Sequence, residues 1–305
     1  LPTLIRTMKR TPPVDLRPIA VHAMEKYDFL PRYPEAVLRE VAGFVQEGKI
    51  PDYSSGTRDL RDLLWSSIDN ADSEDLDQLE YCERLPGGEI RVLVAIADVD
   101  AYVGKGSATD RYAEWNGTSV YTGITTFPML PDTLSKGATS LLPDEDRLAM
   151  VAEYVVFPDG SMEFGEVVPS LVRNKAKLVY ETTGAWLAGD APIPDKIRAT
   201  PGLEEQVRLQ HEAAKRLRKF RMQQGALDLE TLEASPVIEE GIVRDLIVIT
   251  QNPARIIIEE LMVAANRTMV AALERAGLPV IERVVRTPKN WEGIVLTAQS
   301  LGERL

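Results

Sequence analysis

The sequence predicts an α+β protein: a largely antiparallel or mixed β-sheet with long flanking helices, preceded by a small helical N-terminal segment. Two observations predict this class. Three pairs of apolar-rich segments are each joined by a short turn that contains Gly, which is typical of β-hairpins. Long amphipathic stretches lie between and after these pairs, and hairpins that alternate with long helices favour an α+β fold over a doubly wound parallel sheet.

The beginning of the chain, residues 1–55, is expected to form a helical accessory segment followed by a linker. Its stretches 16–27 and 34–45 repeat apolar residues at helical spacing. The stretch 47–57 combines Gly, Pro and Ser, as linkers do. We therefore predict a domain boundary near residue 55, with a larger second domain over 56–305.

The larger domain contains the three expected hairpins. They cover 79–99, 147–172 and 235–250, and their turns are Pro-Gly-Gly, Pro-Asp-Gly and Glu-Glu-Gly. Gly allows the backbone conformations that tight turns require, so each turn supports the pairing of the strands beside it.

Two long helices are expected in the same domain, over 202–222 and 253–276. The first is amphipathic and strongly basic. The second begins with Pro253 and is followed by Gly277, and Pro at the start with Gly after the end is typical of helices.

Composition excludes several classes of protein. No apolar run is long enough to span a membrane, so we expect no membrane partner. We also expect a monomer. The single Cys82 excludes an internal disulfide and fits a reducing cytoplasm, where we expect the protein. Two histidines leave little room for a His-based nuclease or a Ser-His-Asp hydrolase. The net charge of −12 argues against a surface that coats nucleic acid, but it allows a locally basic channel.

Six acidic side chains lie within residues 69–80. Asp75 and Asp77 are two residues apart, so an extended backbone would direct both carboxylates to one side, and a loop could bring Asp69 beside them. Oxygen donors without His or Cys suit Mg²⁺, with Mn²⁺ as a second choice. An exposed acidic loop is the alternative, and spacing alone leaves the two open.

The residues around this cluster, DLRDLLWSSIDNADSEDLDQLEY, resemble the catalytic signature of the ribonuclease II / ribonuclease R family, which carries the RNB domain. The resemblance continues in VLVAIADVDAYVGKGSATDRYAEWNGTSVY, FPMLPDTLSKGATSLLPDEDRLAM, VRNKAKLVYE, QGALDL and RIIIEELMVAAN. These blocks follow the family's order and cover about residues 58–285.

The resemblance implies a metal-dependent exoribonuclease that degrades RNA from its 3′ end to nucleoside 5′-monophosphates. Asp69, Asp75 and Asp77 match three of the family's four active-site aspartates, which implies that they are catalytic and hold Mg²⁺ or Mn²⁺. The fourth position is Gln78, whose neutral oxygen should hold a cation more weakly.

The departure at Gln78 leaves two hypotheses. Either a neighbour such as Asp72 or Glu74 compensates for the missing charge, or the protein is a catalytically impaired RNA-binding member of the family. We expect Asp72, Glu74 and Glu80 to be the solvated members of the acidic cluster.

The resemblance also implies residues that bind a single-stranded RNA 3′ end. Tyr121 matches an aromatic that stacks on the terminal bases, with a core tyrosine as the alternative. Tyr180, Glu259 and Glu260 match residues around the last nucleotide and its 2′-hydroxyl. Consecutive helical positions point about 100° apart, so we favour Glu259 for the site. An exposed helix face is the alternative for both glutamates.

The basic segment 215–224 places five cations around Phe220. It suits an RNA strand whose phosphates lie on Lys and Arg side chains, Arg221 among them, with a base against Phe220. The segment 173–177 adds positive charge through Lys177. The alternative is a solvated basic face with Phe220 in the core. The basic segment counts against a third hypothesis, a metal-bound structural module without RNA.

Two features of the family are missing from the sequence. One is a segment like T-x-P-[IL]-R-[RK]-Y-x-D, whose Arg contacts the scissile phosphate, and the other is a C-terminal S1-type domain. The resemblance therefore implies an RNB domain that is incomplete on its C-terminal side.

Overall fold

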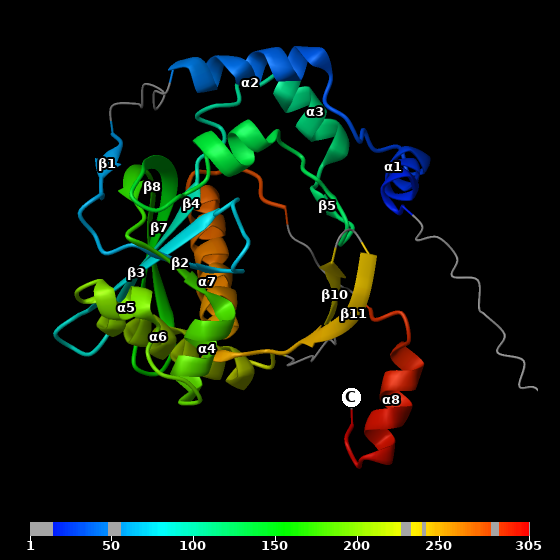
Figure 1. The fold of residues 1–305 in the computed structure, drawn as a ribbon. Helices are drawn as coiled ribbons and strands as arrows, with labels where there is room; N and C mark the ends of the chain where they lie inside the picture. Colours follow the sequence, from blue (N-terminus) through cyan, green and yellow to red (C-terminus); the bar gives the residue numbers. More distant parts are fainter. Residues whose placement is uncertain (1–14, 48–55, 227–232, 240–241, 282–286, 305) are drawn as a thin grey trace, which may run out of the picture. The chain divides into compact units, whose positions relative to one another are not determined.

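The computed structural model describes residues 15–47, 56–226, 233–239, 242–281 and 287–304 (Figure 1). The chain divides into two compact units, Leu1–Met269 and Val270–Leu305. The second unit holds the end of helix α7 and the helix α8 (Trp291–Ser300). No helix within the described ranges is long and apolar enough to cross a membrane.

A seven-stranded sheet organises the first unit, in the order β1-β8-β7-β4-β3-β2-β9. Its strands are β1 (Arg58–Asp59), β2 (Ser66–Asp69), β3 (Gln78–Arg84), β4 (Ile90–Ala97), β7 (Asp146–Val156), β8 (Met162–Arg173) and β9 (Ala176–Val179). The β1–β8 and β2–β9 pairs are parallel and the other pairs are antiparallel. The predicted α+β class with a largely antiparallel, mixed sheet is confirmed.

The hairpins lie where the sequence predicts them. Strands β3 and β4 form the first and β7 and β8 the second. The third is a separate pair, β10 (Glu233–Glu239) with β11 (Ile242–Ile249), whose turn at 240–241 lies outside the described residues. A further short pair that the sequence did not predict joins β5 (Val120–Tyr121) to β6 (Thr126–Phe127).

The helices of the first unit include the four that the sequence predicts. They are α1 (Arg17–Lys26), α2 (Glu35–Glu47), α6 (Leu203–Gln223) and α7 (Pro253–Arg275), of which the part up to Met269 lies in this unit. Most of the predicted linker, residues 48–55, lies outside the described residues, and the domain boundary near residue 55 stays a prediction. The sequence analysis did not predict α3 (Ala108–Asn116), the π-helix η1 (Thr133–Ala138), α4 (Tyr180–Ala188) or α5 (Asp195–Ala199).

Helices α6 and α7 bury apolar side chains against the same face of the sheet (Figure 1). Helix α6 presents Leu203, Val207 and Leu217 to the core, at the spacing expected for one helical face. The Gln206 side chain bonds both backbone groups of Cys82 in β3, at 2.9 and 2.6 Å. These contacts fix α6 across the central strands.

The opposite face of the sheet packs into a second core cluster. It contains Trp65, Leu79, Leu93, Leu141 and Val151, all nearly or fully buried. Strand β3 is therefore covered on both sides, so residues that alternate along it are buried whether they are apolar or polar.

Candidate active site

The acidic loop, residues 70–77, connects the end of β2 to the start of β3, two neighbouring interior strands of the sheet. Strand β2 ends at Asp69 and the chain re-enters the sheet at Gln78. On its other side β2 pairs in parallel with β9, where Asp69 lies opposite Val179. Helix α4 begins at Tyr180, the next residue. The sheet topology thus brings Tyr180 beside the acidic loop, although more than a hundred residues separate them in sequence.

Hydrogen bonds within the loop and from Ser140 hold the loop in place. The Ser73 hydroxyl donates to Asp69 Oδ1 at 2.5 Å. The Ser140 hydroxyl accepts from the Leu76 amide at 3.0 Å and donates to the Glu74 carbonyl at 2.7 Å. The backbone that carries the carboxylates is therefore anchored on both sides of Asp75.

Lys177 also anchors this loop. Its ammonium group donates to the carbonyl oxygens of Ala71 at 3.1 Å and Ser73 at 2.5 Å. The sequence analysis assigned Lys177 to RNA binding, which stays a prediction. In the structure its charge lies against the acidic loop and offsets part of the negative charge there.

The three predicted catalytic aspartates act on one another electrostatically. Asp77 as a whole is exposed, but protein atoms around its carboxyl group displace water and raise its pKa, and the charges of Asp69 and Asp75 raise it further. Asp69 is half-buried, whereas Asp75 is exposed and accepts a hydrogen bond from the Tyr121 hydroxyl at 3.4 Å. Carboxylates placed in this way favour a positive charge between them.

The donor chemistry fits a divalent cation, since the three carboxylates are hard oxygen ligands of the kind that Mg²⁺ binds. As placed, no three His, Cys, Asp or Glu side chains in the described part of the chain are close enough together to hold a metal ion. Asp69, Asp75, Asp77 and Gln78 are the residues that would hold it.

Glu80 corrects one expectation. The sequence analysis placed it among the solvated acids, but it is 0% exposed, because β3 is covered on both faces. Gln78, two residues earlier on the same strand, is 6% exposed. Burial raises the pKa of Glu80 well above its ordinary value, and Asp77 and Asp69 raise it further. Glu74, by contrast, is exposed and pairs with Lys136 at 3.3 Å.

Tyr180 lies under an arginine at the start of α7. The guanidinium of Arg255 is 4.4 Å from the centre of the Tyr180 ring and donates to Glu181 at 3.0 Å. Burial raises the pKa of the Tyr180 hydroxyl, and the charge of Asp69 adds to this effect. Tyr180 therefore stays a neutral hydrogen-bonding group beside Asp69.

The two predicted glutamates of α7 both contact Arg221 of α6. Arg221 binds Glu260 through two nitrogens, at 2.6 and 3.1 Å, and Glu260 is 1% exposed. Glu259 is half-exposed, accepts from Arg221 at 3.0 Å and from Gln251 at 3.0 Å. Glu260 thus joins the two helices, and Glu259 is the more accessible of the pair.

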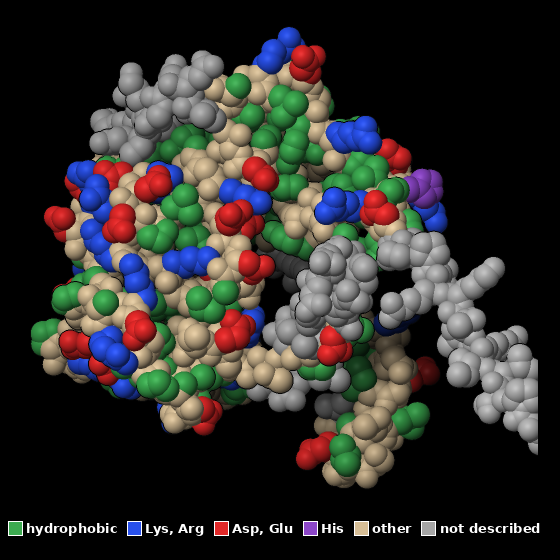
Figure 2. All heavy atoms as spheres, in the orientation of Figure 1, with side chains coloured by type: hydrophobic (Ala, Val, Ile, Leu, Met, Phe, Trp, Pro, Cys, Tyr) green, Lys and Arg blue, Asp and Glu red, His purple; other side chains and the backbone are tan. Residues whose placement is uncertain are grey.

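The basic segment of α6 is divided between two faces of the helix. Phe220 is half-buried, with its Cβ beside Gly160 in the β7–β8 turn. Lys215 and Lys219 are exposed and border a hollow of about 710 Å³ that Arg208 also lines. Figure 2 shows acidic and basic side chains intermixed over the face in view.

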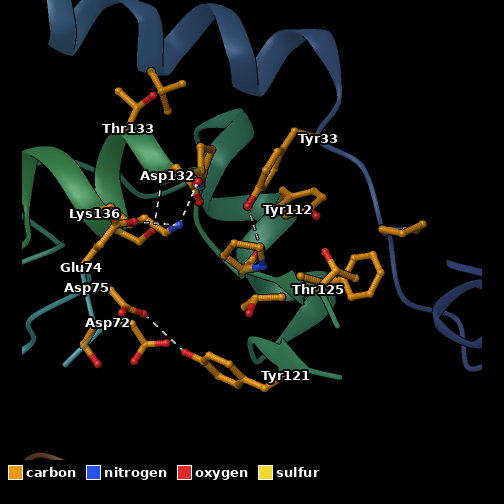
Figure 3. Close-up of a pocket in the computed structure, with 18 of the residues that line it drawn as sticks. Tyr33, Asp72, Glu74, Asp75, Tyr112, Tyr121, Thr125, Asp132, Thr133 and Lys136 are labelled. Atoms are coloured by element: carbon orange, nitrogen blue, oxygen red, sulfur yellow. Dashed lines mark hydrogen bonds and ion pairs between the residues drawn. The ribbon is translucent and has the colours of Figure 1, made fainter. Parts of the chain in front are cut away.

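A cavity of about 830 Å³ borders the outer side of the acidic loop (Figure 3). Its lining includes Asp72 and Asp75, with Tyr121 opposite them, and Lys136, which bridges Glu74 and Asp132. Tyr33, from the chain between α1 and α2, donates to the Pro128 carbonyl at 2.8 Å on the far wall. The sequence analysis did not identify Tyr33, which stands outside the quoted motifs, and it gave no role to Lys136, which stands within the block FPMLPDTLSKGATSLLPDEDRLAM.

Comparison with known proteins places this arrangement in a family. The family model of the RNB domain matches residues 57–301. The curated protein Ribonuclease R of Thermotoga maritima is 36% identical over 282 residues, which are 91% of this chain and 38% of the relative. The chain spans less than half the length of such relatives.

Solved structures share the fold. "Mycoplasma genitalium RNase R in complex with ribose methylated single-stranded RNA" matches with a TM-score of 0.81 at 24% identity, over 93% of this chain and 44% of that chain. The same protein in complex with double-stranded RNA matches with a TM-score of 0.80 at 24% identity, over 93% of this chain and 50% of that chain. The resemblance that the sequence carries is confirmed by the family match, which spans the sheet, the acidic loop and both long helices: the chain belongs to the RNB domain family.

Proposed function

We propose that the protein is an exoribonuclease that hydrolyses RNA from the 3′ end to nucleoside 5′-monophosphates with a divalent cation, Mg²⁺ or Mn²⁺. The observation that carries the proposal is the junction of β2, β3 and β9, where Asp69, the acidic loop and Tyr180 are neighbours. Membership of the RNB domain family and relatives named Ribonuclease R support it.

The chemistry of each side chain suits it to a different role in the proposed reaction. Asp69, Asp75 and Asp77 would hold the cations, which supply water activation and stabilisation of the leaving oxygen when bound. The exposed ring of Tyr121 offers a face on which a base can stack. The Tyr180 hydroxyl and the Glu259 carboxylate offer polar groups for a 2′-hydroxyl, which DNA lacks.

The direct test is digestion of 5′-labelled single-stranded RNA with Mg²⁺, comparing the natural protein with Asp77→Asn. We expect a ladder that shortens from the 3′ end, slowed at least about a hundredfold by the substitution. Asp195→Asn is the matched control, because this side chain is 97% exposed at the start of α5. Equal cleavage by both variants would exclude the proposed site.

A second candidate, an RNA-binding protein without cleavage, is favoured by one observation. Gln78 is buried and neutral at the position where the family resemblance implies a fourth aspartate. RNA retained but uncut by the natural protein, with Mg²⁺ or Mn²⁺ present, would support this candidate over the nuclease.

A further inference from the structure

Arg255 is an arginine at which three segments of the candidate site meet. It lies in the first turn of α7, and its guanidinium is 4.4 Å from the centre of the Tyr180 ring. Its Nη2 donates to Glu181 Oε1 at 3.0 Å and approaches Asn70 Oδ1 at 3.5 Å. Asn70 directly follows Asp69, the last residue of β2, and begins the acidic loop. Arg255 therefore places a positive charge where α7, α4 and the acidic loop come together.

The ion pair of Arg255 has one exposed partner. The Arg255 side chain is 22% exposed, whereas that of Glu181 is 62% exposed. An exposed carboxylate contributes little to an ion pair, because water solvates it well when the pair opens. Within the described part of the chain both polar contacts of the guanidinium use Nη2, so Nε and Nη1 keep N–H groups for another acceptor. Arg255 can therefore exchange Glu181 for another anion while it stays over the Tyr180 ring.

Two other cations at the acidic loop are engaged in a different way. Lys177 donates to two backbone carbonyls of the loop. Lys136 is shared between the carboxylates of Glu74 and Asp132. Arg255 has one carboxylate for its one charge, so a single incoming anion can replace that carboxylate.

A phosphate group of RNA suits this position. A phosphodiester carries one negative charge, as Glu181 does, so the exchange leaves the local charge unchanged. The planar guanidinium donates parallel N–H groups that match two phosphate oxygens. RNA at the acidic loop has to bring its phosphates close to carboxylates, and a cation beside Asp69 offsets that repulsion.

We infer that Arg255 binds a phosphate group of the RNA at the acidic loop, and that Glu181 occupies Arg255 until RNA arrives. This inference rests on the proposed function, which brings an RNA 3′ end to the acidic loop. Arg255 is then a substrate-binding residue, and Glu181 competes with RNA for the same cation. The competing explanation is structural: Arg255 only supports Tyr180, and its ion pair with Glu181 stays closed in the complex.

The experiment measures binding of 5′-fluorescent single-stranded RNA to the full chain by fluorescence anisotropy, in EDTA and at several salt concentrations. Arg255→Gln should weaken binding about tenfold. It should also reduce the slope of log affinity against log salt by about 0.7, the value for one phosphate contact on a single strand. Arg255→Lys keeps the charge and should retain the natural slope. Circular dichroism checks that each variant is folded.

A double-mutant cycle with Glu181→Gln tests the exchange itself. Removal of the competing carboxylate should tighten RNA binding about threefold when Arg255 is present, and this gain should vanish in the Arg255→Gln background. Arg58→Gln and Glu166→Gln are the matched controls. Their ion pair is also exposed, and it joins β8 to β1, which lies at the opposite edge of the sheet from β9. Neither control should change the RNA affinity more than about twofold.

Three results overturn the inference and leave the proposed function standing. They are unchanged affinity in Arg255→Gln, a loss of affinity with the natural salt slope, which would assign Arg255 to the support of Tyr180, and an equal gain from Glu181→Gln in both backgrounds. If Arg255→Gln does not fold, Glu181→Gln beside Glu166→Gln decides. Equal affinities of these two variants overturn the inference, and an affinity about threefold higher in Glu181→Gln supports it. A natural protein that neither binds nor cleaves RNA removes both the inference and the proposed function.

Discussion

The hydroxyl of Tyr121 donates a hydrogen bond to Asp75 Oδ2 over 3.4 Å, and this bond joins the β5–β6 pair to the acidic loop (Figure 3). The rest of Tyr121 is open to solvent, with 69% of its surface exposed. An aromatic ring is thereby held at the border of the carboxylates with its face accessible.

Substitution of Tyr121 tests whether this ring binds RNA. Tyr121→Ala should weaken binding of single-stranded RNA about tenfold, because a stacked base contributes roughly 1–3 kcal/mol. Tyr121→Phe keeps the ring and should retain most of the affinity. Fluorescence anisotropy in EDTA measures binding without cleavage. Tyr27→Ala is the matched control, since Tyr27 is 68% exposed at the end of α1. Natural affinity in Tyr121→Ala would contradict the stacking role.

The buried acid Glu80 predicts how stability depends on pH. Its pKa in the folded protein is raised well above the ordinary 4.5, by burial first and then by Asp77 and Asp69. A raised folded-state pKa stabilises the fold fully below the unfolded pKa, and this contribution is lost as pH rises through the folded pKa. In EDTA, the free energy of unfolding should therefore fall from about pH 5 upward.

Urea denaturation across this pH range, on the natural protein and on Glu80→Gln, measures the effect. The variant cannot ionise at this position, so its unfolding free energy should decline less with pH. The pH dependence would have another origin if both proteins declined equally.

The Arg221–Glu260 pair predicts a large loss of stability. Arg221→Ala removes both hydrogen bonds that the guanidinium donates to the buried Glu260 carboxylate and leaves only Arg218, 3.7 Å away, as its cation, which should cost about 3 kcal/mol of unfolding free energy. Arg58→Ala is the comparison, because the Arg58–Glu166 pair is exposed on both sides and should contribute less than about 1 kcal/mol. Urea denaturation at neutral pH measures the free energy of unfolding of both variants. Equal losses would show that the burial of Glu260 does not make its ion pair more important for stability.

Gly184 predicts a steric effect on the start of α7. A Cβ at this position would lie 2.5 Å from Asn252 Oδ1, the atom that accepts hydrogen bonds from the amides of Ala254 and Arg255. Gly184→Ala should displace this cap and reduce the unfolding free energy by about 1–2 kcal/mol.

Gly43 supplies the matched control for that substitution. It also lies within a helix, α2, but a Cβ there meets no atom within 4 Å. Gly43→Ala should stabilise the protein by up to about 1 kcal/mol. Thermal denaturation followed by circular dichroism separates the two, and a stabilising Gly184→Ala would exclude the steric argument.

Local patterns predicted most of the long elements. The turns at Pro-Gly-Gly and Pro-Asp-Gly, between segments rich in apolar residues, were enough to place β3 with β4 and β7 with β8. Strands β2 and β9 have four residues each and pair across a long stretch of chain, so no local pattern revealed them. Their pairing, and not a motif, is what brings Tyr180 to Asp69.

The candidate site was also predicted only in part, because some of its features depend on contacts between segments that are distant in the sequence. The family resemblance identified Asp69, Asp75 and Asp77, whose assignment as metal ligands stays a prediction. The burial of Glu80 could not be read from a run of acids, because it depends on the cover that α6 and the second core cluster give to β3. The basic segment was predicted to bind an RNA strand. In the structure Arg221 pairs with Glu260, because helix α7 packs on the same face of the sheet and supplies the carboxylate.

The parallel pairing of β2 with β9 also sets the order in which the nascent chain can assemble. When β2 leaves the ribosome, β3 follows directly and can pair with it, but residues 70–175 must be synthesised before β9 is available. Contacts between segments so distant in sequence form late and slowly, since closing a long loop has a large entropic cost. Strand β2, which ends at Asp69, therefore pairs with β9 only after most of the sheet has been translated. Tyr180, which follows β9, reaches its position beside Asp69 at the same late stage.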